Sequence, residues 1–113
     1  MTANRRRGEI EAELDGKPYR LCLTLGALAE LEAAYAADDL GALVERFSRG
    51  RLSALDMIRV IGAGLRGGGN AVSDDEVRAM RSEDGAAGFA AVVSDLLTTT
   101  FGAAGEGAEP PNP

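Results

Sequence analysis

Hydrophobic and polar residues alternate through residues 8–24, on both sides of Asp15 and Gly16. An Asp-Gly dipeptide suits the positive φ angles of a two-residue type I′ turn, so this pattern predicts a β-hairpin. One face of the hairpin is then apolar, and helices must cover it because a two-stranded hairpin is only marginally stable in water. The expected register pairs Leu14 with Lys17, Glu13 with Pro18, Ala12 with Tyr19, Glu11 with Arg20 and Ile10 with Leu21.

The two outer edges of this hairpin are open to two interpretations. In the first, charged side chains and Pro18 protect the edges against aggregation. In the second, another subunit adds a strand at one edge.

The period of the hydrophobic positions changes from two to about 3.6 at Thr24, which indicates that a helix begins there. We expect helices at about 25–36, at 40–48, from Ser53 to the glycines at 67–69, from Ser73 to about Arg81, and at about 84–101. Ser53 with Asp56 and Ser73 with Glu76 form two predicted capping boxes. The fold class is therefore α+β and mostly α, with an N-terminal two-stranded β-hairpin followed by a bundle of about five short helices.

Glycines interrupt the predicted helices at two places. Gly62 and Gly64 favour close contact with a neighbouring backbone, since they lower helix stability otherwise. The run at residues 67–70 predicts a flexible joint, because three consecutive glycines have little conformational preference. A phosphate-binding loop is excluded there, as no Lys-Ser/Thr pair follows the glycines and no strand precedes them.

The length of 113 residues predicts one domain. We assign residues 8–102 to a single domain of hairpin and helices. Residues 1–7 form a flexible basic N-terminus, and residues 103–113, rich in Pro, Gly and Glu, form a disordered tail.

The net charge of −6 argues against nonspecific nucleic-acid binding. No hydrophobic run is long enough to cross a membrane, and the N-terminus lacks the apolar segment of a signal peptide. The single cysteine, Cys22, excludes an internal disulfide and is typical of a reducing compartment. We therefore expect a cytoplasmic protein with neither a nucleic-acid nor a membrane partner.

Residues that carry chemistry are few. The chain has no histidine, so the usual general base at neutral pH is missing. The acidic run at residues 73–76 fits a helix cap better than a calcium loop, which alternates its ligands around a glycine. We expect no enzymatic activity, no cofactor, no metal and no small-molecule substrate.

Apolar residues of the first two predicted helices are the candidate contact surface for a partner protein. They are Leu28, Leu31, Tyr35, Leu40 and Val44. The alternative is that these five side chains form the core of the monomer.

The stretch LTLGALAELEAAYAADDLGALVERFSRGRLSALDMIRVIGAGLRGGG, followed by VSDDEV, resembles a family of small tail-region proteins of alphaproteobacterial gene transfer agents and related prophages. The family is grouped with the tail assembly chaperones, and the likeness covers all but the proline-rich tail.

The resemblance implies a role in assembly and transfers no individual functional residue. Tail assembly chaperones cover the tape-measure protein while the tail tube polymerises, and then leave. The resemblance therefore implies the tape-measure protein and other tail proteins as partners, with self-association. The alternative is a permanent structural component of the tail, either a minor tail protein or one associated with the tube.

Overall fold

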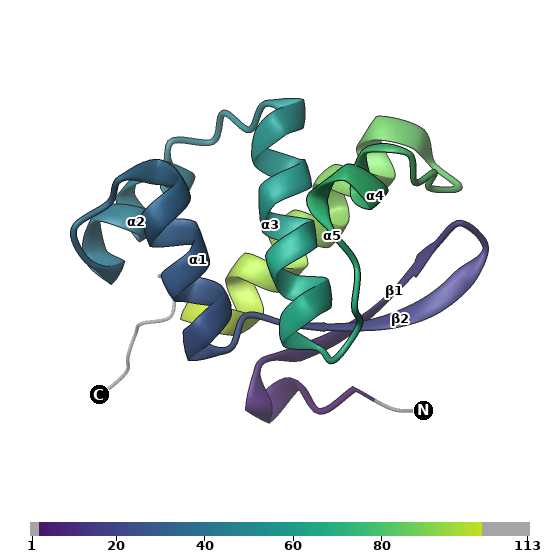
Figure 1. Cartoon of the computed structure of the whole chain (residues 1–113), viewed down its shortest axis with the longest axis horizontal. Helices are drawn as coiled ribbons and strands as arrows, with labels where there is room; N and C mark the ends of the chain where they lie inside the picture. The colour runs from purple at the N-terminus through teal and green to yellow at the C-terminus, as the bar shows by residue number, and fades with distance from the viewer. Residues whose placement is uncertain (1–2, 103–113) are drawn as a thin grey trace, which may run out of the picture.

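The computed structural model describes residues 3–102, and it has the predicted fold class. An antiparallel two-stranded sheet is followed by five helices, and a short 3-10 helix precedes the sheet (Figure 1). The elements are η1 (Arg5–Arg7), β1 (Glu9–Leu14), β2 (Lys17–Cys22), α1 (Leu25–Tyr35), α2 (Leu40–Ser48), α3 (Ala54–Gly67), α4 (Asp74–Arg78) and α5 (Gly85–Phe101).

The hairpin has the predicted register at every pair, from Leu14 with Lys17 to Ile10 with Leu21. Asp15 and Gly16 have φ angles of 55° and 73°, as a type I′ turn requires. One polar-face residue differs from the prediction, because Glu9 is only 8% exposed. The segment before β1 covers it, and its Oε1 accepts a hydrogen bond from the Asn4 amide at 2.8 Å.

Four of the five α-helices have an N-cap residue whose side chain accepts a hydrogen bond from the backbone amide three residues later. Both predicted capping boxes are complete. The capping residues are Thr24, Asp39, Ser53 and Ser73. The main difference from the predicted boundaries is α4, which ends at Arg78 rather than near Arg81.

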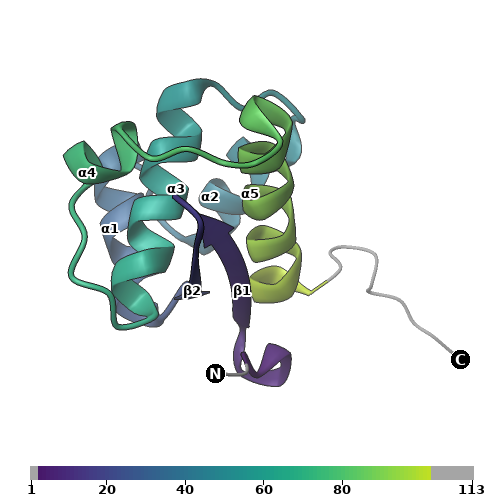
Figure 2. The same ribbon diagram turned by 90° about the vertical axis from the view of Figure 1, so that its right-hand side faces the viewer.

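Helix α3 lies at the centre of the molecule, in contact with β2, α1, α4 and α5 (Figures 1 and 2). Val60, Ile61 and Leu65 on α3 are 0–1% exposed. They belong to one hydrophobic core that also includes Leu21 of β2 and Leu96 of α5. The apolar face of the hairpin is therefore covered by helices, as expected.

The glycine run at the end of α3 is packed closely against β2, which corrects the prediction of a flexible joint. A Cβ atom at Gly67 would overlap the carbonyl oxygen of Cys22, and one at Gly68 would overlap that of Arg20. Asn70 Nδ2 also donates a hydrogen bond to the Arg20 carbonyl at 2.8 Å. These contacts cover the outer edge of β2 at Arg20 and Cys22.

The other two helical glycines of α3 make room for side chains rather than for backbone. A Cβ atom at Gly64 would lie 2.6 Å from Leu96 Cδ2. One at Gly62 would overlap the carboxylate of Asp74. The predicted close approach is present, but its partner was assigned incorrectly.

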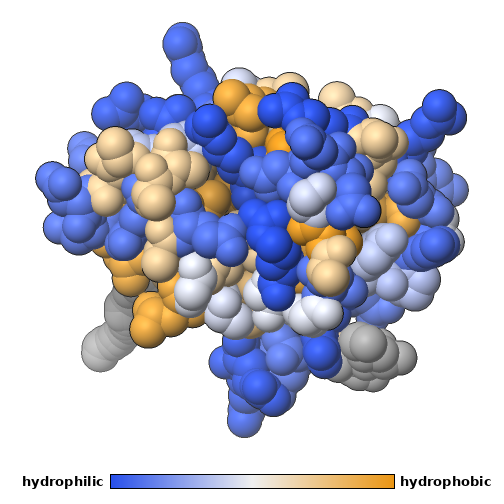
Figure 3. Space-filling model, viewed as in Figure 1, coloured by the Kyte–Doolittle hydropathy of each residue, from blue (hydrophilic) through white to orange (hydrophobic). Residues whose placement is uncertain are grey.

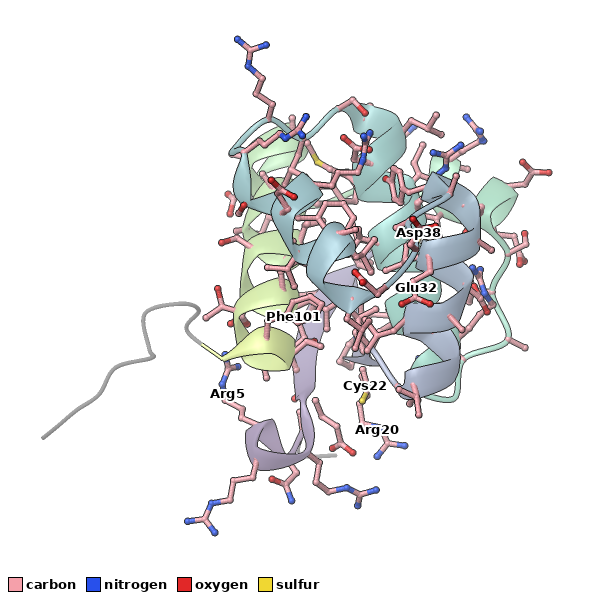
Figure 4. All side chains as sticks on the ribbon, turned by 90° about the vertical axis from the view of Figure 1, so that its left-hand side faces the viewer. Arg5, Arg20, Cys22, Glu32, Asp38 and Phe101 are labelled. Carbon is pink, nitrogen blue, oxygen red and sulfur yellow. The ribbon has the colours of Figure 1, made fainter. Side chains whose placement is uncertain are left out.

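The basic segment before the hairpin contacts the last helix, and the flexibility expected for residues 1–7 stays a prediction. Asn4 caps η1, and the Arg5 guanidinium pairs with Asp95 on α5 and donates to Thr99 Oγ1 at 2.9 Å (Figure 4). The hairpin is thereby connected to the last helix. The tail predicted to be disordered, residues 103–113, lies outside the described residues.

Candidate protein-binding groove

An apolar groove lies between α3, α4 and the beginning of α5, with a volume of about 190 Å³. We call it the α3–α5 groove. Its lining is formed by Ala54, Met57, Ile58, Ile61, Val77, Arg78, Met80, Ala86 and Phe89.

The groove has a buried floor and half-buried walls. Ile61 and Val77, 1% and 4% exposed, form the floor. Met57, Met80 and Phe89 are partly buried and line the groove. Methionine side chains are flexible and polarisable, so they adapt to apolar partners of differing shape. Such a lining suits the apolar face of an amphipathic helix better than a polar small molecule.

Two hydrogen bonds attach one end of the groove to the hairpin turn. The Asp15 amide donates to the carbonyl oxygen of Arg81 at 2.8 Å. In return, the Arg81 amide donates to Asp15 Oδ1 at 2.9 Å. The segment after Met80 is therefore fixed by a pair of bonds that join residues 66 positions apart.

Arg66 holds α4 in place beside α3. Its Nη1 donates to the carbonyl oxygen of Val72 at 2.8 Å and lies 3.1 Å from Asp74 Oδ1. Its Nη2 pairs with Glu30 on α1 at 2.7 Å. Asp74 Oδ1 is buried and accepts no hydrogen bond among residues 3–102, so the Arg66 charge is its main compensation. One arginine thus fixes the position of the helix that forms a wall of the groove.

The five predicted contact residues lie elsewhere, on α1 and α2. Leu28 and Leu31 are in the hydrophobic core, 7% and 2% exposed. Tyr35 and Val44 are half-buried, and Leu40 is 37% exposed. Only three of the five offer surface to a partner, so a contact role for the set stays a prediction. Val44 also lines a smaller apolar hollow of about 130 Å³ between α2 and α5.

Tyr35 belongs to a polar cluster that joins α1, α2 and α3. Its hydroxyl donates to Asp56 Oδ1 at 2.6 Å, and the guanidinium carbons of Arg46 and Arg59 lie 4.3 and 5.1 Å from its ring centroid. Its ring also packs edge to face against Phe47, with centroids 5.4 Å apart. These contacts resemble those of a structural joint, because the Tyr35 hydroxyl and the Asp56 carboxylate both have hydrogen-bond partners within the chain.

The ionisation of this cluster follows from its environment. Burial, and then the hydrogen bond to Asp56, raise the pKa of Tyr35 to about 12. Burial alone would raise the pKa of Asp56, but hydrogen bonds from Tyr35, Ser53 and Arg46 outweigh it and hold that pKa below 3.8. At neutral pH the phenol is therefore a donor and the carboxylate is ionised.

Cys22 lies beside Arg20 at one end of the hairpin (Figure 4). Its thiol donates to the carbonyl oxygen of Arg7 at 3.6 Å. Burial, followed by the negative charge of Glu9, raises the pKa of the thiol. The thiolate fraction at neutral pH is correspondingly small. Among residues 3–102, no group of three or more His, Cys, Asp and Glu side chains is arranged to hold a metal ion.

Sequence reasoning did not identify the α3–α5 groove. Met57, Ile58 and Phe89 belong to the apolar stripes of their own helices, and nothing in their spacing distinguishes a core position from a groove wall. The sequence offered one signal of additional contacts, which is that apolar residues from Met57 to Leu65 lie on more than one side of α3. Helix α3 needs apolar residues on several sides because it contacts four other elements.

The view of Figure 3 shows apolar surface only as small patches between hydrophilic side chains. Over residues 3–102, no helix has the length and hydrophobicity needed to cross a membrane.

Comparison with known proteins identifies a matching family. The family described as phage tail tube protein, GTA-gp10, matches residues 7–103, which include both strands and all five helices. No curated protein and no solved structure shows significant similarity to the chain. Because the match extends over most of the chain, this protein belongs to the phage tail tube protein (GTA-gp10) family, a tail-region family of gene transfer agents.

Proposed function

We propose that this tail-family protein is an assembly chaperone that acts by binding rather than by catalysis. Its partner is the tape-measure protein, from which the α3–α5 groove receives the apolar face of a helical segment during tail assembly in the cytoplasm of the producing cell. The observation that carries the proposal is the groove itself, with its apolar floor and its two methionines.

The small sheet supports the same proposal. The described residues contain two strands, and the outer edge of β2 is covered by Gly67, Gly68 and Asn70. A tube subunit that builds a ring through its sheet needs strand edges on both sides. A chaperone that binds helices has no such requirement.

Co-expression with the tape-measure protein, followed by affinity capture, tests the role of the groove. Met80→Lys and Ile58→Glu place a charge on the groove walls, and we expect them to lower the captured tape-measure protein by roughly tenfold or more, since a buried unpaired charge is costly. The matched control is Leu25→Glu, because Leu25 is 79% exposed at the start of α1, outside the groove. Melting curves establish that each variant is folded. Capture that is equal for groove variants and control would contradict the proposal.

A permanent structural role is the second candidate, and the description of the family as a tail tube protein favours it. Quantitative mass spectrometry of purified particles separates the two. We expect the chain to be absent from finished particles, or present far below the level of tail-tube subunits. Stoichiometric amounts in mature tails would establish the structural role instead.

A further inference from the structure

The outer edge of β1 is open over a short, defined stretch. In the observed register Glu11 and Glu13 occupy the non-hydrogen-bonded pairs, so their amide and carbonyl groups point away from β2. Neither residue has a backbone hydrogen bond on that side within residues 3–102. The neighbouring outward amides are occupied, because Glu9 donates to Asn4 at 3.1 Å and Asp15 donates to Arg81 at 2.8 Å.

This open edge borders a groove of about 280 Å³ that is lined by residues of β1 and α5. Figure 2 shows these two elements side by side. On the α5 side, the lining beside the strand includes the small residue Ala91. Four backbone groups are free, two on Glu11 and two on Glu13. They can pair with an added strand of roughly three to five residues.

The negative charge of this groove beside β1 favours a positively charged occupant. Five carboxylates line it and no Lys or Arg does, and within residues 3–102 only Asp95 among them has an ion-pair partner, Arg5. These carboxylates belong to Glu11, Glu13, Glu83, Asp84 and Asp95. A second copy meeting edge to edge would bring Glu11 and Glu13 against their own equivalents, and like charges opposite one another destabilise a sheet.

We propose that the β1 edge binds an extended basic segment of a partner protein by strand addition. Residues of the added strand opposite Glu11 and Glu13 lie on the solvent face and are lysine or arginine. The residues between them point towards α5 and are small or apolar, because strand side chains alternate between faces. The site is separate from the α3–α5 groove and does not depend on the proposed chaperone role.

The probe is an acetylated, amidated hexapeptide of alternating lysine and valine, titrated into the full chain and followed by amide NMR. We expect saturable binding that weakens with salt, shifts at the amides of Glu11 and Glu13, and new protection of these two amides from hydrogen exchange. A glutamate–valine hexapeptide of the same length should not bind. A lysine–valine peptide with N-methyl groups on alternate residues keeps its charge but cannot donate the backbone hydrogen bonds to β1. It should therefore bind roughly tenfold more weakly.

Protein variants test the same contact from the other side. Glu11→Lys with Glu13→Lys should weaken lysine–valine binding roughly tenfold and allow glutamate–valine binding. The control Asp38→Lys with Glu45→Lys makes an equal charge change at two exposed positions, just before α2 and on it, and should leave binding unchanged. Equal binding of the N-methylated peptide would overturn the proposal, since attraction by charge alone would explain it. Self-association that protects the same two amides, seen by sedimentation without peptide, would overturn it as well.

Discussion

At the residue scale, Tyr35 on α1 is bonded to Asp56 on α3. Helix α1 does not line the α3–α5 groove, whereas α3 does, so this bond links the groove to the rest of the helices. The bond between them is short, at 2.6 Å, and Asp56 also completes the capping box of α3. Because the hydrogen bonds lower the pKa of Asp56, its contribution to folding is present above about pH 4 and is lost as the pH falls through its folded-state pKa. The raised pKa of Tyr35 acts on the alkaline side, where its contribution is lost as the pH rises from about 10 towards 12.

Replacing Tyr35 by phenylalanine should lower the free energy of unfolding by about 1 kcal/mol at pH 7. The difference in unfolding free energy between the variant and the original protein should shrink below pH 4. Protonated Asp56 is stabilised less by the Tyr35 hydroxyl than the carboxylate is. Urea denaturation at pH 7, 5 and 3 measures both effects. Tyr19→Phe is the control, since the Tyr19 hydroxyl has no hydrogen bond within residues 3–102. A Tyr35→Phe deficit that is the same at all three pH values would contradict the assigned hydrogen bond.

At the element scale, the contact between the end of α3 and β2 depends on the absence of side chains. Gly67 and Gly68 lie on carbonyl groups of the strand, where a methyl group has no space. This arrangement brings the α3 terminus and the strand edge closer than ordinary side chains allow.

Gly68→Ala should therefore lower the free energy of unfolding by roughly 3 kcal/mol, as overpacking against backbone does. Gly26→Ala is the matched control, because Gly26 is exposed on α1 and its Cβ would lie 3.9 Å from Thr24 Oγ1. That change should stabilise the protein by about 0.5–1 kcal/mol through helix propensity. Midpoints of urea denaturation measure both. An unchanged midpoint for Gly68→Ala would show that the glycine segment can move away from the strand.

The sequence was most informative about elements whose signals are local. Alternation around Asp15 and Gly16 is enough to define the hairpin register, and Ser53 and Ser73 define the starts of their helices. The Asn4-capped turn of η1 was missed because a run of arginines has no hydrophobic period. The role of Gly68 was missed because the group that leaves no space for a side chain, the Arg20 carbonyl, lies 48 residues away in the sequence.

The α3–α5 groove could not be predicted for a related reason. Its walls come from three helices, and no short-range pattern says which apolar side chains of each helix stay partly uncovered once the helices pack. The same limit applies to Leu28 and Leu31, for which the sequence left both a contact surface and the monomer core open and which are buried in the structure. Tertiary packing decides both cases.

At the scale of the whole molecule, one hydrophobic core unites every strand and α-helix. Buried residues of the hairpin, such as Ile10 and Leu21, belong to the same cluster as Leu43 of α2 and Val93 of α5. None of these elements has a separate core within the described residues. The hairpin and helices should therefore fold as one cooperative unit.

We expect thermal or urea unfolding to show a single transition. Far-UV circular dichroism reports the helices, and the fluorescence of Tyr19 and Tyr35 reports the hairpin and α1. Both curves should have the same midpoint and the same slope. Separate midpoints would show that the hairpin detaches from the helices before they unfold.

The two sides of the sheet are unequal, since glycine backbone and Asn70 cover β2 while β1 stays partly open. The sheet therefore accepts an added strand beside β1 but not beside the covered part of β2. Copies of this chain cannot form a continuous sheet in which β1 of one copy pairs with β2 of the next, because the Arg20 and Cys22 carbonyl groups are already covered.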